Sequence, residues 1–228
     1  LGIASQKEAL IANTERFLAG KPSNHVLLWG SRGTGKSSLI KALLLEYEGQ
    51  SLRVIQLAKE DLHWLPELSD ELSQEEFKFI IFCDDLSFED GETSYKGLKS
   101  ILEGSIETPP ANIKVYATSN RRHLVPEYTE DNQHASYGAG GELHLGDRVE
   151  ERISLADRFG LSLSFYQGNL EDYLALVKSY FAHQLASEIP PELDEKELLA
   201  AAVMFAKQRA SYSGRTAQQF FNAYSVSS

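Results

Sequence analysis

The chain has 228 residues, with 22 lysines and arginines against 33 aspartates and glutamates, so its formal net charge is −11. Hydrophobic residues make up 42% and aromatic residues 10%, which is enough for a folded core and excludes a wholly disordered chain. A single cysteine, Cys83, excludes an internal disulfide framework.

No apolar run reaches the roughly 20 residues of a membrane-spanning helix, and no signal-peptide pattern is present. We therefore expect a cytoplasmic protein without a membrane partner. Because the sequence begins with Leu1 rather than Met, we expect its native start to be missing.

The acidic residues are concentrated in one segment. Between Glu60 and Glu92 there are 12 acidic residues and one basic residue, Lys78, which leaves 21 acidic and 21 basic residues elsewhere. Net charge therefore does not exclude a nucleic-acid partner, and the simplest interpretation of the segment is a solvated helix face.

Strands and helices alternate over the first part of the chain. Apolar runs bounded by turn residues predict strands at 25–29, 52–57, 77–83, 113–118 and 161–165. Apolar residues at helical spacing predict helices at 5–18, 37–48, 62–72 and 95–102. This alternation predicts an α/β fold on a five-stranded parallel sheet. The polar, glycine-containing segment 121–150 is expected to be a long mobile loop.

The pattern becomes helical from Asn169, a candidate N-cap with Asp172 three positions later. After Pro190 and Pro191, Asp194 is positioned to cap a second helix, and a third begins near Arg215. We therefore predict an α/β domain over 1–168 and a small helical lid over 169–228.

The strongest motif is GSRGTGKS, which lies between a predicted strand and a predicted helix. Glycines let successive backbone N–H groups point at phosphate oxygens, and the helix that follows presents its positive end to the anion. In such a loop Lys36 reaches the β- and γ-phosphates, and the Ser37 hydroxyl binds Mg²⁺. A chance glycine-rich turn is the alternative, which the strand–loop–helix context disfavours. The predicted nucleotide-binding residues are Gly30, Ser31, Arg32, Gly33, Thr34, Gly35, Lys36, Ser37 and Ser38.

A second motif is the apolar strand that ends in Asp84 and Asp85. Paired carboxylates at the carboxyl end of a parallel strand lie where α/β sheets bind ligands. We expect Asp84 to hold Mg²⁺ with Ser37, and Asp85 to orient or deprotonate the attacking water. The alternative is a turn acid followed by a helix cap. Cys83 is expected to be a small core residue.

Three further polar residues complete the set. Asn120 ends the strand beside the carboxylate strand, where its amide could contact the γ-phosphate and the attacking water. Arg158 precedes the last strand, and Arg215 opens the last helix. A guanidinium near the γ-phosphate stabilises transition-state charge, although an isolated arginine is more often a surface ion-pair partner.

In this order these elements resemble an AAA+ ATPase. The segments VLLWGSRGTGKSSLIKALL, IIFCDDLSFE, KVYATSNRRHL, ISLADRFGLSLSFY and YSGRTAQQF resemble a bacterial AAA+ family of unknown function, from about Asn13 to Phe220. The resemblance implies ATP and Mg²⁺ as ligands and assembly into a homo-oligomer. It also implies a sensor-1 role for Asn120, an arginine-finger role for Arg158 and a sensor-2 role for Arg215.

One departure from the AAA+ pattern leaves the function open. Most AAA+ proteins have Glu where Asp85 stands, and Asp is shorter by one methylene. The leading hypothesis is an ATP hydrolase that couples turnover to conformational change or assembly. The alternative is a nucleotide-gated binding module with little hydrolysis, whose candidate partner is nucleic acid, as for initiator and loader AAA+ proteins. A small-molecule kinase is disfavoured because its lid is usually inserted within the α/β domain.

The remaining clusters point to partners only weakly. His123, His134 and His144 lie in one loop, but their spacing matches no compact zinc site. Adjacent Arg121 and Arg122 fall short of a DNA-binding stripe. We expect the acidic segment 60–92 to face a neighbouring subunit's basic residues, which are Arg121, Arg122, Arg148, Arg152 and Arg158.

Overall fold

The computed structural model describes residues 2–47, 49–88, 94–103, 110–122, 124, 136–137, 143–144, 155–184 and 194–224. It divides into two compact units. The sheet unit comprises residues 8–30 and 37–164, and the helical unit comprises residues 1–7, 31–36 and 165–228. This grouping places most of the glycine-rich loop with the C-terminal helices. The division into domains at residue 168 stays a prediction.

A five-stranded parallel sheet forms the centre of the sheet unit, which confirms the predicted α/β fold. The strand order is β2-β3-β4-β1-β7, so β2 and β7 are the edges. The register pairs Phe82 of β3 with Tyr116 of β4, and Tyr116 with Val26 of β1. The strands are β1 (Val26–Gly30), β2 (Leu52–Gln56), β3 (Lys78–Cys83), β4 (Ile113–Ser119) and β7 (Leu161–Phe165).

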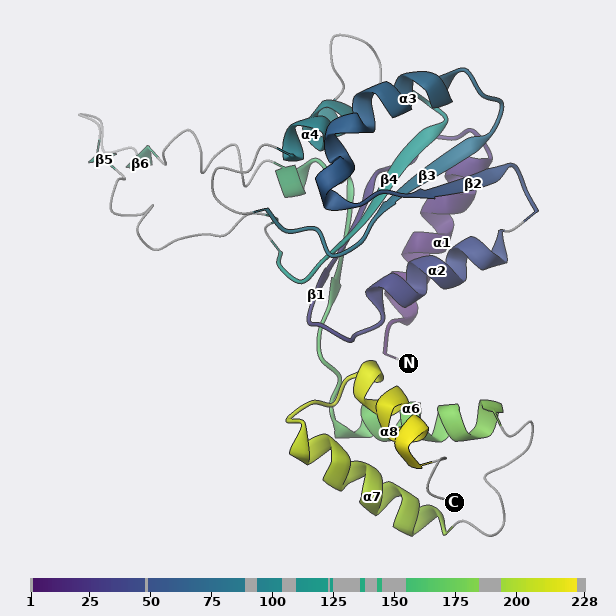
Figure 1. Ribbon diagram of the computed structural model, residues 1–228, viewed down its shortest axis with the longest axis vertical. Helices are drawn as coiled ribbons and strands as arrows, with labels where there is room; N and C mark the ends of the chain where they lie inside the picture. The colour runs from purple at the N-terminus through teal and green to yellow at the C-terminus, as the bar shows by residue number, and fades with distance from the viewer. Residues whose placement is uncertain are drawn as a thin grey trace. The chain divides into compact units, whose positions relative to one another are not determined.

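Helices cover both faces of this sheet, as its apolar strands require. Figure 1 shows α1 (Ala4–Leu18) and α2 (Lys36–Glu46) on one face, and α3 (Leu65–Ser73) and α4 (Tyr95–Glu103) on the other. On the α1 face, the Tyr116 hydroxyl is buried and lies 2.7 Å from the Thr14 hydroxyl. On the α3 face, the core is apolar, with Leu27, Leu62, Leu65, Ile81, Leu98 and Val115 all buried.

The predicted helix at 62–72 corresponds to α3, which begins three residues later than predicted. The residues before it form a 3-10 helix, η1 (Lys59–Trp64), and Pro66 lies in the first turn of α3, where its missing N–H group costs no hydrogen bond. The acidic side chains of this region are exposed, in agreement with a solvated face. They are Glu60, Asp61, Glu67, Asp70, Glu71, Glu75 and Glu76.

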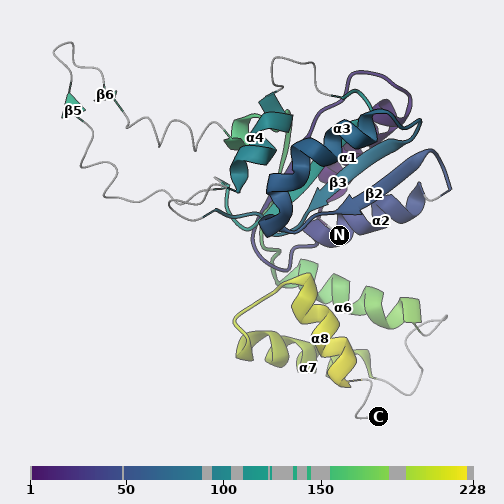
Figure 2. The same ribbon diagram turned by 45° about the horizontal axis from the view of Figure 1, so that its top comes forward.

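The helical unit contains α6 (Leu170–Gln184), α7 (Glu195–Gln208) and α8 (Gly214–Tyr224), which lie together in Figure 2. The core that they share includes the buried aromatic side chains of Tyr173, Phe181, Phe220 and Phe221. Both expected caps are present. Asp172 donates its backbone N–H to Asn169 Oδ1 at 2.9 Å, and Lys196 donates its backbone N–H to Asp194 Oδ1 at 2.8 Å. The Phe181 ring lies edge-on to Phe221, with ring centroids 4.8 Å apart.

Most of segment 121–150, together with Arg148, Arg152, His123 and His134, lies outside the described residues. The part that is described includes two short antiparallel strands, β5 (Ser136–Tyr137) and β6 (Leu143–His144), which the expectation of a loop did not include. Among the described residues no helix is long and apolar enough to span a membrane.

Candidate active site

The carboxylate of Asp84 is held by two hydroxyl groups at the carboxyl end of β3. Ser37 Oγ and Thr118 Oγ1 each donate to Asp84 Oδ1 at 2.6 Å. Ser37 is in the first turn of α2 and Thr118 is in β4, so the fold brings three separate elements to one carboxylate oxygen.

Asp85, the next residue, is held from two sides. Its backbone N–H donates to Thr118 Oγ1 at 2.9 Å, and its side-chain Oδ1 accepts a hydrogen bond from Asn120 Nδ2. Asp85 has a φ of +54°, a left-handed conformation that is uncommon outside glycine and is found most often at Asn and Asp. The structure therefore brings Asp84, Asp85 and Asn120 together at the carboxyl ends of the strands, as predicted for a parallel sheet.

Thr118 is a residue of this cluster that the sequence analysis missed. Its side chain is 2% exposed, and its single hydroxyl bonds both neighbouring aspartates. The available signal was a hydroxyl residue two positions before Asn120 on the strand beside the carboxylates. We call Ser37, Asp84, Asp85, Thr118 and Asn120 the carboxylate cluster.

The donor set of the carboxylate cluster fits a magnesium ion. Mg²⁺ prefers hard oxygen ligands, typically one or two carboxylates with hydroxyl groups, phosphates and water. Asp84 and Ser37 supply a carboxylate oxygen and a hydroxyl oxygen already in contact with each other.

The glycine-rich loop 31–36 bonds within itself in the helical unit. Lys36 is 7% exposed, and its Nζ donates to the Ser31 carbonyl at 2.8 Å. Thr34 Oγ1 donates to the same carbonyl at 2.9 Å. Ser31 and Arg32 are exposed, as is Ser38 in α2.

Arg215 lies beside this loop in the same unit. It is exposed and is the second residue of α8. Gly214, directly before it, donates its backbone N–H to the Gly33 carbonyl at 3.0 Å. The residue predicted for the sensor-2 role thus lies next to the glycine-rich loop.

Arg158 is not brought to the carboxylate cluster. It precedes β7, and Leu161 at the start of β7 bonds the His25 carbonyl at the beginning of β1. Because the strands are parallel, Arg158 lies near the amino-terminal edge of the sheet, whereas Asp84 and Asn120 lie at the carboxyl edge. A five-residue strand separates these edges by about 17 Å.

Cys83 is buried in the core as expected, and burial raises the pKa of its thiol to about 12. Within the described part of the chain, no group of three or more His, Cys, Asp or Glu side chains forms a metal site.

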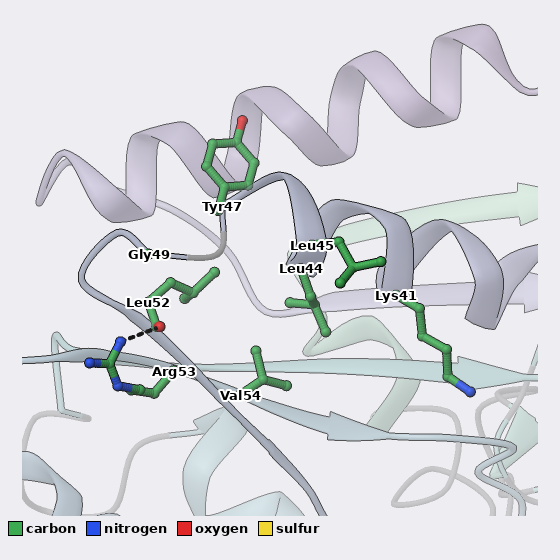
Figure 3. A pocket seen from close by; sticks show the side chains of 8 residues that line it. All are labelled: Lys41, Leu44, Leu45, Tyr47, Gly49, Leu52, Arg53 and Val54. Carbon is green, nitrogen blue, oxygen red and sulfur yellow. Dashed lines mark hydrogen bonds between the residues drawn. The ribbon is translucent and has the colours of Figure 1, made fainter.

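A groove of about 520 Å³ lies between α2 and the edge strand β2. Figure 3 shows Leu44 of α2 and Val54 of β2 pointing toward each other across it. Its lining contains no carboxylate and none of the predicted nucleotide-binding residues, so it is separate from the carboxylate cluster. The lining residues are Lys41, Leu44, Leu45, Tyr47, Gly49, Leu52, Arg53 and Val54.

The solved structures with a similar fold include the following three. RuvB from Thermotoga maritima superposes with a TM-score of 0.52 at 14% identity, over 96% of this chain and 67% of that chain. A replication initiator DnaA bound to AMPPCP and single-stranded DNA has a TM-score of 0.56 at 17% identity, over 97% of this chain and 60% of that chain. A DNA replication initiation factor has a TM-score of 0.56 at 15% identity, over 99% of this chain and 62% of that chain.

The present chain thus spans about two thirds of RuvB and three fifths of the two replication initiation proteins. The fold is that of the AAA+ P-loop ATPases, which confirms the resemblance seen in the sequence. No curated protein matches the sequence. The chain belongs to the protein family of unknown function DUF815, whose model matches residues 1–228.

Proposed function

We propose that this chain is a Mg²⁺-dependent ATPase whose turnover drives a conformational change or assembly. The observation that carries the proposal is the carboxylate cluster, in which Asp84 and Ser37 share a hydrogen bond next to Asp85 and Asn120. In the sequence, the residues of this cluster come after the glycine-rich loop, and the chain has the fold that AAA+ P-loop ATPases share.

In this proposal each residue has one task. Loop 30–38 binds the phosphates, with Lys36 leaving the Ser31 carbonyl to contact the β- and γ-phosphates. Ser37 and Asp84 would hold Mg²⁺, which neutralises developing phosphate charge when bound. Asp85 orients the attacking water and accepts its proton, and Asn120 positions the Asp85 carboxylate. Arg215 contacts the γ-phosphate from α8.

The test is ATP turnover by the purified protein with Mg²⁺, compared with Lys36→Ala. We expect Lys36→Ala to lose at least about a hundredfold in kcat/KM, because a phosphate-contacting cation is removed. Turnover of the wild-type chain that equals the Lys36→Ala background at every protein concentration would contradict the proposal.

A nucleotide-gated module with little hydrolysis is the second candidate. Two observations favour this candidate. Asp85 is shorter than the Glu that is usual at this position, and its carboxylate already accepts a hydrogen bond from the Asn120 amide. It predicts that ATP changes the oligomeric state of wild type and Asp85→Asn alike. Light scattering with and without ATP measures this, and a response present only in wild type excludes the module.

Nucleic acid is a candidate partner because the solved structures that share the fold include a DnaA bound to single-stranded DNA. In this chain Arg121 and Arg122 are exposed directly after Asn120. If DNA binds there, single- or double-stranded DNA should stimulate the ATPase rate of wild type and not of Arg121→Ala/Arg122→Ala. Equal rates with and without DNA would exclude this partner.

A further inference from the structure

The phosphate loop is hydrogen-bonded to the first turn of α8. Gly214 N–H donates to the Gly33 carbonyl, the centre of loop 31–36. We propose that Gly33, Ser213 and Gly214 form a loop–helix latch that passes the state of the phosphate loop to α8 through the backbone, independently of the Arg215 side chain. This inference rests on the proposed function and names how its site is regulated.

The latch leaves no room for a side chain at Gly33. A Cβ there would lie 2.9 Å from Ser213 Oγ and 3.3 Å from Arg215 Cβ, and Gly33 has a φ of +74°. Gly35 also has a positive φ, +95°, but a Cβ there would meet nothing within 4 Å. Both glycines serve the loop conformation, and only Gly33 also serves the contact with α8.

The α8 side of the latch is a rigid block. Ser213 is 6% exposed and caps α8, accepting the Thr216 backbone N–H at its Oγ and the Ala217 backbone N–H at its carbonyl. The hydroxyl of Thr216 lies 2.9 Å from Ser213 Oγ and donates to Ser211 Oγ at 3.1 Å. A shift of the Gly33 carbonyl therefore moves the whole first turn rather than one residue.

Phosphate binding changes the same stretch of loop. The Ser31 carbonyl holds both Lys36 Nζ and Thr34 Oγ1, and phosphate oxygens compete for the Lys36 ammonium group. When Lys36 is released, the hydrogen bond that joins the two ends of loop 31–36 is lost. The backbone between these ends, which includes Gly33, then moves, and the hydrogen bond from Gly214 transmits that movement to α8.

The direct test compares Gly214→Pro with Gly214→Ala. Gly214 is the first helical residue of α8, where proline is well tolerated, so Gly214→Pro leaves the helix intact. It removes the N–H donor, and its ring Cδ, which takes the place of the hydrogen, displaces the Gly33 carbonyl. Gly214→Ala keeps the donor, since its Cβ would lie 3.4 Å from the Gly33 carbonyl oxygen. The readout is hydrogen exchange of the Thr216 and Ala217 amides, without nucleotide and with ATP.

Without nucleotide, we expect these amides to exchange about tenfold faster in Gly214→Pro, the effect of losing one hydrogen bond, and within about twofold of wild type in Gly214→Ala. With ATP, their exchange should change in wild type and Gly214→Ala but not in Gly214→Pro. An unchanged ATP response in Gly214→Pro would overturn the latch. The nucleotide-free comparison holds even if ATP does not bind, so failure of the proposed function is distinguishable from failure of the latch.

A rescue experiment separates the latch from general damage. Gly33→Ala should speed hydrogen exchange of the Thr216 and Ala217 amides. Gly33→Ala/Ser213→Gly should restore the Ala217 amide, which bonds the Ser213 carbonyl, because the two nearest atoms that the new methyl meets, Ser213 Oγ and Cβ, are gone. Glycine is a tolerated N-cap, so α8 survives this change. Gly35→Ala, which is strained but whose new methyl meets no atom within 4 Å, should leave the amides unchanged. Equal loosening in Gly35→Ala, or no rescue, would contradict the latch.

Discussion

Thr118 donates its hydroxyl hydrogen to Asp84 and accepts the backbone N–H of Asp85, so one side chain holds two aspartates to which the proposed function gives different tasks. Asp85 is in a left-handed conformation that its surroundings must maintain. The hydrogen bond to Thr118 is the contact that does this from the backbone, while Asn120 holds the carboxylate. In the proposed mechanism the role of Thr118 is positioning rather than catalysis.

Replacing Thr118 by valine should therefore lower kcat by about ten- to a hundredfold, because the Asp85 N–H and one Asp84 bond lose their buried partner, at about 1–3 kcal/mol each. KM for Mg-ATP should rise less than kcat falls. Steady-state kinetics measure both. Thr118→Ser keeps the hydroxyl and should recover most of the rate, whereas equal losses in the valine and serine variants would point to packing alone.

His25 gives the sheet unit a pH dependence of its own. Its Nδ1 accepts the Val115 backbone N–H at 3.0 Å, and burial, together with the nearby Lys114, lowers its pKa to about 4. In the unfolded chain His25 takes up a proton below about pH 6.5, whereas in the folded chain it does so only below about pH 4. The contribution of neutral His25 to the free energy of unfolding is therefore fully present above pH 6.5. It is lost as the pH drops from 6.5 to 4, which lowers the free energy of unfolding by up to about 3 kcal/mol.

His25→Asn tests this dependence, because the Asn side-chain oxygen can accept the same N–H without titrating. Chemical denaturation at intervals between pH 7 and 4 should show a shallower loss of stability in His25→Asn than in wild type. Parallel curves for the two proteins would show that His25 does not supply the difference.

At the scale of elements, α2 shows which apolar residues support the fold. Leu43 is 4% exposed and packs into the core, whereas Leu45, two positions later, is 70% exposed beside the groove at β2. Leu43→Ala should lower the free energy of unfolding by about 2–4 kcal/mol, and Leu45→Ala by less than about 0.5 kcal/mol. Urea denaturation measures both, and similar losses would mean that the groove is filled in solution.

The strands and caps were predictable from local sequence because their signals are local. The apolar run before Asp84 and the Asn169 and Asp194 caps each depend on a few neighbouring residues. The break between η1 and α3 was missed because Leu-periodic spacing continues across Pro66, and a proline is compatible with a first helical turn as well as with a helix end.

The candidate site was predictable in its residues but not in its connections. The motif identified Ser37, Asp84, Asp85 and Asn120, since parallel strands bring their carboxyl ends together. It did not identify Thr118, because a threonine in a buried strand is equally well explained by β propensity. The bond between Gly33 and Gly214 joins residues about 180 positions apart, for which no sequence spacing gives a signal.

At the scale of the whole molecule, the position of Arg158 favours assembly. Since it lies near the amino-terminal edge of its own sheet, an arginine-finger role requires the carboxylate cluster of another subunit. Turnover per chain should then rise with protein concentration. Mixing Arg158→Ala with Asp85→Asn should restore activity that neither variant has alone, and absence of any recovery would contradict a finger supplied in trans.

The charge distribution bears on the same assembly. Seven exposed acidic residues lie between Glu60 and Glu76, while Arg121 and Arg122 are exposed after β4. If acidic and basic faces meet between subunits, raising salt from low to moderate ionic strength should weaken oligomerisation and cooperative turnover. Sedimentation at two salt concentrations measures this, and indifference to salt would exclude a charge-driven interface.

The most direct test of the central claim is kcat for Mg-ATP in wild type and Asp85→Asn, with the ATP dissociation constant measured in parallel. The Asn side chain keeps an oxygen that can accept from Asn120, so the substitution removes basicity while preserving the hydrogen bond. We expect kcat to fall at least about a hundredfold with binding changed less than about threefold. An unchanged kcat would contradict the assignment of hydrolysis to the carboxylate cluster.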